Sequence, residues 1–211
     1  MFEVNDKDFY FFKDQINPSE ETTYNLKKFV SMLLDYQNNM NLIGKSTMPT
    51  IWKRHILDSA QIEKFLPKEN KNHITVDVGT GAGFPGIVLA LMGRKDLLLC
   101  EKSTKKNIFL NAVAQECNLK VKLYNDRIEN LKAAKIRTIV ARAFAPLKNL
   151  ILKVRCCLNG DTTLVLHKGR TYMKEIIEAK SLFCFNYKCY NSITNSDAKI
   201  LKIDNIQEKN E

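Results

Sequence analysis

The sequence predicts an α/β fold, in which a mostly parallel sheet of seven strands carries helices and follows a helical N-terminal extension. Residues 73–94 combine an apolar strand, a glycine-rich turn and an apolar helix, the unit that opens a nucleotide-binding α/β domain. Beyond it, strand-like and helix-like segments alternate, as in parallel β–α–β units. The last two strand-like segments follow one another without a helix, so an antiparallel edge is expected. We expect the extension to cover residues 1–72 and the main domain residues 73–211.

The first helix of the extension has a clear start. Ser19 can cap it, and Glu20 and Glu21 then fall in its first turn, where negative charge is favourable. The helix is expected to end near Asn38. Apolar residues at helical spacing give it one apolar face, which predicts docking on the main domain. The residues of this face are Leu26, Phe29, Val30, Leu33 and Leu34.

Residues 50–60 predict a second helix, on which His55 and Asp58 lie three positions apart and can share a face. A capping or core hydrogen bond and a role in a functional site both remain open for this pair. Before these helices, residues 1–20 carry a cluster of aromatic residues. After them, the polar residues 68–72 predict the linker to the main domain.

The main domain alternates strands and helices. The expected strands are residues 74–78, 96–101, 120–124, 136–143, 162–166, 182–190 and 198–203. The expected helices are residues 87–91, 103–117, 147–158 and 173–181. The fourth strand is mostly apolar, which favours burial on both faces. In the helix of residues 103–117 we expect Ile108, Phe109, Ala112 and Val113 to face inward.

Composition bounds the location and partners of the chain. Its 211 residues contain no run of the roughly 20 apolar residues that a membrane helix needs. The polar, acidic N-terminus resembles neither a signal nor a transit peptide, so a cytoplasmic protein is expected. Six scattered cysteines without a C-x-x-C pair predict reduced structural thiols and no metal site. Nothing in the sequence demands more than a monomer.

The net charge of +10 favours a polyanionic partner, nucleic acid above all. A lysine-rich composition without a dedicated binding face is the alternative. No single basic cluster decides between them.

The glycine-rich turn raises the question of which nucleotide it binds. Residues 81–86 match G-x-G-x-x-G, a pattern of NAD- and FAD-binding proteins, but Asp77 precedes the turn by two residues and would repel a pyrophosphate. Pro85 also removes one N–H from the helix start, where a phosphate would need donors. S-adenosylmethionine lacks phosphate and carries positive sulfonium and amino groups, which suit the Asp77 carboxylate. The turn, with Gly79 and Gly81, therefore predicts an S-adenosylmethionine site.

Two further residues lie where such a site needs them. Glu101 ends the second strand, at the position where nucleotide-binding folds place the carboxylate that holds the ribose hydroxyls. Arg142 ends the apolar fourth strand, and ligands of open α/β sheets lie at the carboxyl ends of the strands. An arginine in such a buried position needs a partner or a ligand.

Together these segments resemble the RsmG (GidB) family of bacterial guanine-N7 methyltransferases of the small-subunit ribosomal RNA. The resemblance extends over about residues 20–170, with the motifs in the family's order. The matching motifs are Asn41-Leu42, Arg54-His-Ile-Leu-Asp-Ser59, Asp77-Val-Gly-Thr-Gly-Ala-Gly-Phe-Pro-Gly86, Arg127-Ile-Glu129, Arg142-Ala-Phe-Ala145 and Lys168-Gly169.

The resemblance implies a Rossmann-like class I S-adenosylmethionine-dependent methyltransferase fold. It also implies methyl transfer to N7 of one guanosine in the 16S ribosomal RNA of the small subunit. By motif, Gly79 and Phe84 would line the cofactor pocket, Ile128 and Glu129 would border the adenine, and Arg142 would lie beside the cofactor. Asp77 and Glu101 join this cofactor-binding set by their charge and position.

Guanine N7 has an in-plane lone pair, so no proton has to leave before it attacks a methyl group. We therefore expect catalysis by positioning and electrostatics, with Arg142 as the catalytic residue that bonds O6 of a flipped guanine. The candidate RNA phosphate contacts are Lys53, Arg54, Lys168 and Arg170.

Two alternatives from other classes stay open. An NAD-dependent oxidoreductase is opposed by Asp77 and by the lack of a recognisable catalytic dyad. A non-catalytic RNA-binding protein with a residual pocket is opposed by the intact glycine turn and Glu101. A cytosine-C5 methyltransferase would need a nucleophilic cysteine, and the sequence has no Pro-Cys pair.

Overall fold

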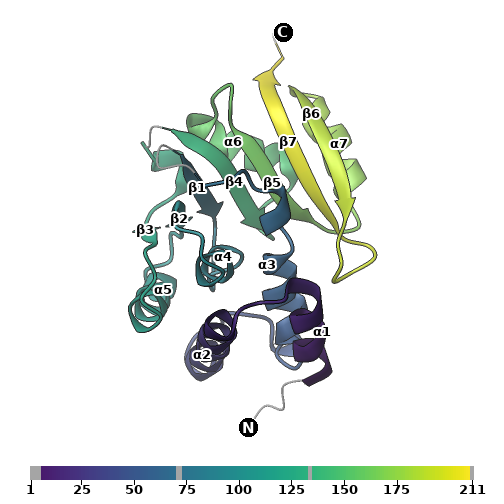
Figure 1. Cartoon of the computed structure of the whole chain (residues 1–211). Helices are drawn as coiled ribbons and strands as arrows, with labels where there is room; N and C mark the ends of the chain where they lie inside the picture. The colour runs from purple at the N-terminus through teal and green to yellow at the C-terminus, as the bar shows by residue number, and fades with distance from the viewer. Residues whose placement is uncertain (1–5, 70–72, 133–134, 210–211) are drawn as a thin grey trace.

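In the computed structural model, which describes residues 6–69, 73–132 and 135–209, a seven-stranded sheet lies between two layers of helices (Figure 1). The strands run in the order β3-β2-β1-β4-β5-β7-β6. The first five in sequence are parallel, and β7 pairs antiparallel with both β5 and β6. The predicted mostly parallel sheet with an antiparallel edge is confirmed. The strands are β1 Ile74–Val78, β2 Leu97–Cys100, β3 Lys122–Tyr124, β4 Ile136–Arg142, β5 Thr163–Lys168, β6 Phe183–Asn191 and β7 Lys199–Glu208.

The central strands are covered on both faces, which explains their nearly continuous apolar sequences. Val76, Ile139, Val140 and Leu164 have no solvent-exposed surface. The strand order reverses between β1 and β4, because β2 lies on one side of β1 and β4 on the other. In open α/β sheets the ligand crevice lies at this switch point, outside the carboxyl ends of the strands.

Each face of the sheet has its own helical layer (Figure 1). Helices α4 (Gly86–Leu91) and α5 (Thr104–Glu116) lie on one face, and α6 (Leu147–Val154) and α7 (Tyr172–Lys180) on the other. In α5, Phe109 and Val113 are fully buried as expected. The expectation for Ile108 is wrong: it is 55% exposed. Successive helix residues are about 100° apart, and the helix turns Phe109, not Ile108, toward the core.

The N-terminal extension contains helices α1 (Asp6–Ile16), α2 (Glu20–Gln37) and α3 (Asp58–Ala60), with a π-helical segment η2 (Trp52–Leu57) directly before α3. The Ser19 cap of α2 is confirmed, since its side chain accepts a hydrogen bond from the Thr22 N–H at 3.1 Å. The sequence did not predict α1. This helix buries Phe12 against the Trp52 ring, with 5.5 Å between the ring centroids.

The extension and the main domain share one hydrophobic core. Phe29 of α2 packs on Phe84 of the glycine-rich turn and on Phe109 of α5, at centroid distances of 5.5 and 6.3 Å. Such aromatic pairs contribute about 0.5–1.5 kcal/mol each beyond the burial of their area. The extension therefore packs against the turn itself. The boundary between residues 72 and 73 stays a prediction, and residues 70–72 of the expected linker lie outside the described residues.

Among the helices that the structure describes, none is long and apolar enough to cross a membrane.

Candidate functional site

The glycine-rich turn after β1 exposes bare backbone at the switch point of the sheet. Gly79 and Gly81 have φ angles of +67° and +61°, in the left-handed region that favours glycine. The ring of Phe144 lies against Gly79, and a Cβ added to this glycine would collide with it. A side chain at position 79 would therefore have to displace Phe144.

Asp77 lies beneath this turn and lines neither of the cavities described below. The side chain is fully buried, and Oδ2 accepts a hydrogen bond from the Gly86 N–H at 2.7 Å. Pro85 has no N–H, so the first backbone donor of α4 is already bonded to a carboxylate. This arrangement disfavours a phosphate at the helix start. Whether Asp77 also acts on a bound cofactor stays a prediction.

Burial raises the pKa of the Asp77 carboxyl from 3.8 to about 7, although the Gly86 N–H favours its ionised form. Between about pH 4 and pH 7, Asp77 is therefore protonated in the folded protein and ionised in the unfolded chain. This contribution to stability is fully present below about pH 4 and is lost as the pH rises through 7. It amounts to at most about 4 kcal/mol. Asp77→Asn keeps an acceptor for the Gly86 N–H but does not titrate.

We therefore expect the stability of Asp77→Asn to fall less than that of the wild type between about pH 5 and pH 8. Thermal unfolding of both cofactor-free proteins at several pH values measures the difference. If the melting temperatures of the two proteins changed with pH in the same way across this range, the raised pKa of Asp77 would be contradicted.

The first of two adjoining cavities, the Glu101 cavity, has a volume of about 380 Å³. The Glu101 carboxylate accepts hydrogen bonds from the Gly81 N–H at 3.0 Å and the Ser103 N–H at 2.8 Å. A carboxylate has about four lone-pair sites, so it can still accept from two hydroxyl groups. Four of the predicted cofactor-binding residues lie together around this cavity: Gly79, Glu101, Ile128 and Glu129.

Ile128 and Glu129 belong to the short helix η4 (Ile128–Asn130), which follows β3. The Ile128 side chain is buried and forms an apolar part of the Glu101 cavity. Glu129 is paired with Lys153 at 2.8 Å, and the hydrogen bond from Lys153 lowers the pKa of its carboxyl below the ordinary value. Glu129 is therefore ionised at neutral pH.

The second cavity, the Arg142 cavity, has a volume of about 520 Å³ and shares Gly79, Lys106 and Ala143 with the first. It lies over the ends of β4 and β5 and under η2. The predicted residues that line it are Gly79, Gly81, Phe84, Arg142, Arg54 and Lys168. Lys53 and Arg170 do not line it.

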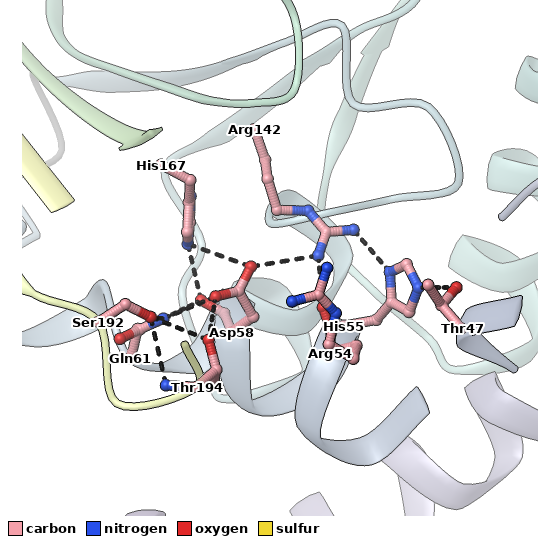
Figure 2. A network of polar contacts seen from close by, with 9 residues as sticks. All are labelled: Thr47, Arg54, His55, Asp58, Gln61, Arg142, His167, Ser192 and Thr194. Carbon is pink, nitrogen blue, oxygen red and sulfur yellow. Dashed lines mark hydrogen bonds and ion pairs between the residues drawn. The ribbon is translucent and has the colours of Figure 1, made fainter. Parts of the chain in front are cut away.

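Arg142 is fixed by contacts from the extension (Figure 2). Its Nη1 donates to the backbone oxygen of Arg54 at 2.9 Å and to Oδ2 of Asp58 at 3.3 Å, and its Nη2 donates to Nδ1 of His55 at 2.8 Å. The guanidinium also lies 4.8 Å from the centre of the Phe84 ring. Its Nε–H and second Nη2–H have no partner among the described residues. The side chain is therefore held in place, and these two N–H groups stay available as donors.

His55 is neutral, because burial and the Arg142 charge lower its pKa to about 3. Since Nδ1 accepts from Arg142, the ring proton is on Nε2 and is donated to Oγ1 of Thr47 at 2.7 Å. Thr47 in turn donates to the backbone oxygen of Gly44 at 2.7 Å. This chain of hydrogen bonds fixes the tautomer and removes His55 as a proton acceptor near neutral pH.

The π-helical turn places both His55 and Asp58 beside Arg142. The backbone N–H of Asp58 bonds to the oxygen of Lys53, five residues earlier, which is the wide hydrogen-bonding pattern of a π-helix. Oδ1 of Asp58 accepts from Thr194 at 2.7 Å and from Gln61 at 2.8 Å (Figure 2). The question left open for His55 and Asp58 is answered in part: both make partly buried hydrogen bonds, and both line the Arg142 cavity.

Three residues of these cavities were missed from the sequence. Phe144 covers Gly79, His167 donates from Nε2 to the backbone oxygen of Asp58 at 2.7 Å, and Thr194 bonds Asp58. The position of His167 at the end of β5 was a usable signal, because the same argument had pointed to Arg142 at the end of β4. For Thr194, in the loop before β7, the sequence offers no comparable signal.

The four candidate RNA contacts differ in exposure. Lys168 is only 7% exposed, and its ammonium bonds to the Ala145 oxygen at 2.8 Å and to Glu175 at 2.7 Å. Since Lys168 is committed to these partners, we do not retain it as a phosphate contact. Arg54 and Arg170 are exposed, while Lys53 is half-buried beside the Phe11 ring.

Solved structures share this architecture. The ribosomal protein L11 methylase of Lactobacillus delbrueckii subsp. bulgaricus is 20% identical and matches with a TM-score of 0.55 over 74% of this chain and 79% of that chain. A putative S-adenosyl-L-methionine-dependent methyltransferase from Methanococcus maripaludis is 14% identical, with a TM-score of 0.54 over 84% of this chain and 94% of that chain. The fold is that of a class I S-adenosylmethionine-dependent methyltransferase.

The sequence identifies the family within this class. Residues 22–203 match the family model GidB, described as rRNA small subunit methyltransferase G. A protein named ribosomal RNA small subunit methyltransferase G from Orientia tsutsugamushi is 38% identical over 89% of this chain and 92% of its own length. One of the same name from Rickettsia prowazekii is 36% identical over 86% and 93%. The chain belongs to the family of rRNA small subunit methyltransferase G, as its motifs had indicated.

Proposed function

We propose that this protein transfers a methyl group from S-adenosylmethionine to N7 of a guanosine in the 16S ribosomal RNA of the small subunit. The observation that carries the proposal is the Arg142 guanidinium, which is fixed in the wall of the Arg142 cavity and keeps two N–H donors free of partners among the described residues. An arginine so held can donate to O6 and to other acceptors of a guanine edge.

The residues that line the Glu101 cavity fit the groups of the cofactor. Glu101 keeps lone pairs for the ribose hydroxyls, buried Ile128 offers an apolar surface for the adenine, and Gly79 lines the cavity with backbone alone. Bound there, S-adenosylmethionine supplies an electrophilic methyl group. Asp77 contributes beneath the turn, as an acceptor that keeps Gly86 in place.

The residues around the Arg142 cavity suit a reaction that needs no general base. His55 is neutral, and its one basic nitrogen already accepts from Arg142. Burial lowers the pKa of His167, the Asp58 charge opposing this effect, and Nε2 of His167 donates to the Asp58 backbone. Guanine N7 presents its lone pair without losing a proton. The chain's task is therefore to hold the base and the methyl group in line.

The alternatives are less well supported. The family relationship favours neither an NAD-dependent oxidoreductase nor a non-catalytic RNA-binding protein. In addition, the Gly86 N–H that a dinucleotide phosphate would use is bonded to Asp77. Action as a monomer in the cytoplasm stays a prediction.

The decisive test is transfer of labelled methyl from S-adenosylmethionine to small ribosomal subunits that lack the modification, followed by digestion of the RNA. We expect label in 7-methylguanosine at one site. Label in another base would contradict the N7 assignment. Cofactor binding without any transfer would support the non-catalytic alternative.

RNA binding should depend on the exposed arginines beside the Arg142 cavity. Neutralising Arg54 and Arg170 together, as Arg54→Gln and Arg170→Gln, should lower the slope of log K against log salt by about 1 per lost phosphate contact. Binding of a 16S RNA fragment over a salt series measures the slope. Lys120→Gln is the control, because Lys120 is also an exposed cation and lies at the amino end of β3, away from both cavities. An unchanged slope in the double variant would exclude these arginines as contacts.

A further inference from the structure

We propose that Asp58 is a positioning residue of the methyl transfer, which orients the Arg142 guanidinium toward the target guanine. The inference rests on the proposed function, in which Arg142 contacts the base. It assigns a role to a residue of the N-terminal extension and thereby makes the extension part of the active site.

The two oxygens of the Asp58 carboxylate have different partners (Figure 2). Oδ2 faces Arg142, with 3.3 Å to Nη1. Oδ1 faces the other way and accepts from Thr194 and Gln61. One oxygen therefore holds the guanidinium while the other fixes the carboxylate to its surroundings.

Asp58 is held from three parts of the chain. Gln61 lies one turn further along the extension, His167 bonds the Asp58 backbone oxygen from the end of β5, and Thr194 reaches it from the loop before β7. Ser192 completes the arrangement by bonding both Gln61 and Thr194, at 3.1 and 2.9 Å. A carboxylate restrained in this way cannot rotate freely, so it can impose a direction on its arginine partner.

The environment makes this contact significant. The side chains of Asp58 and Arg142 are 17% and 16% exposed, and no other carboxylate is paired with Arg142 among the described residues. Burial opposes ionisation of Asp58, but the charge of His167 when that ring is protonated, the charge of Arg142 and the hydrogen bonds from Thr194 and Arg142 outweigh it, and its pKa lies below the ordinary value. Arg142 therefore faces a fixed negative charge on one side and the cavity on the other.

Without Asp58, the guanidinium would keep its bonds to the Arg54 oxygen and to His55. Both of these acceptors are neutral, and neither defines its orientation as strongly as an ion pair with a carboxylate does. We expect the guanidinium then to sample orientations that do not meet the base. Small misplacements of a positioning group can cost about 100-fold in rate.

Asp58→Asn isolates this contact. The amide oxygen of asparagine can replace Oδ1 and keep the bonds from Thr194 and Gln61, while its NH₂ group takes the place of Oδ2 and opposes the donors of Arg142. We expect kcat to fall about 10- to 100-fold. The Kd for S-adenosylmethionine should stay within about twofold, because Asp58 does not line the Glu101 cavity.

Asp96→Asn is a matched control for the loss of a buried ion pair. Asp96 pairs with Arg94 at 2.7 Å, with side chains 8% and 2% exposed, at the opposite end of the sheet from both cavities. We expect both Asp96→Asn and Asp58→Asn to lower the melting temperature. When kcat is measured below the melting temperature, Asp96→Asn should leave it within about twofold of the wild-type value.

A double-mutant cycle with Arg142→Ala tests whether Asp58 acts through Arg142. The double variant Asp58→Asn/Arg142→Ala should turn over no more slowly than Arg142→Ala alone. Wild-type kcat in Asp58→Asn, an equal loss of kcat in Asp96→Asn, or additive losses in the double variant would each overturn the inference. If the wild type formed no 7-methylguanosine, the proposed function would fail first and this inference with it. If the wild type were active, Arg142→Ala impaired and Asp58→Asn unaffected, only the role of Asp58 would fail.

Discussion

Replacing Arg142 by alanine should lower methyl transfer to the small subunit about 100- to 1,000-fold, the range found when one preorganised donor at a reacting centre is removed. The guanidinium is ordered before any substrate binds, by His55, Asp58 and the Arg54 backbone. Little reorganisation is thus needed when the base arrives. The loss should appear in kcat, because an orienting contact acts most strongly in the transition state.

Arg142→Lys is the informative control for this prediction. It keeps the positive charge but lacks the planar fork that bonds Asp58 and His55 at the same time, so we expect an intermediate loss. Both variants should bind S-adenosylmethionine within a few-fold of the wild type, as calorimetry would measure. Turnover by Arg142→Ala at the wild-type rate would exclude the proposed role. Melting temperatures of both variants are needed, since Arg142→Ala leaves Asp58 without its cationic partner.

The fold follows from the sequence where local pattern and burial agree. The predicted bounds of β1, residues 74–78, are those observed, because an apolar alternating segment directly before a glycine turn leaves little choice of register. Helix α1 escaped prediction because its consecutive aromatic residues, Phe9 to Phe12, give no clear periodicity. Ile108 was misplaced because the buried face of α5 is formed by Phe109, Leu110 and Val113, and at about 100° per residue Ile108 lies on the opposite side of the helix.

The candidate site residues were predicted one by one and not as a network, and their roles stay predictions. Arg142 and Glu101 were found from their positions at the ends of strands, an argument that needs only topology. The pairing of Arg142 with Asp58 spans 84 residues, and that of Asp58 with Thr194 spans 136. No periodicity encodes these contacts, because they depend on how the extension docks on the sheet. Lys168 shows the same limit. Its charge suggested a contact with RNA phosphate, but the side chain is buried in the folded chain and its ammonium pairs with Glu175.

Glu101→Ala should weaken S-adenosylmethionine binding about 100-fold without changing RNA affinity. Hydrogen bonds to a charged acceptor contribute about 1.5–3 kcal/mol each, and losing a pair of them to the ribose hydroxyls costs about 3 kcal/mol. The variant also frees the Gly81 and Ser103 N–H groups, so the turn that shapes the Glu101 cavity loses its support. The two effects act in the same direction.

Glu101→Gln separates these two effects. Its amide oxygen can still accept from the Gly81 N–H, but the negative charge and half of the acceptor capacity are lost, so a smaller loss of affinity is expected. Glu116→Gln is the control, because Glu116 is an exposed acid at the end of α5, the helix that follows Glu101, and it is paired with Lys28 at 2.7 Å and distant from the cavity. Calorimetric titration of all three variants gives the affinities. Wild-type affinity in Glu101→Ala would mean that the ribose is held elsewhere, and the Glu101 cavity would then lose its assignment as the cofactor site.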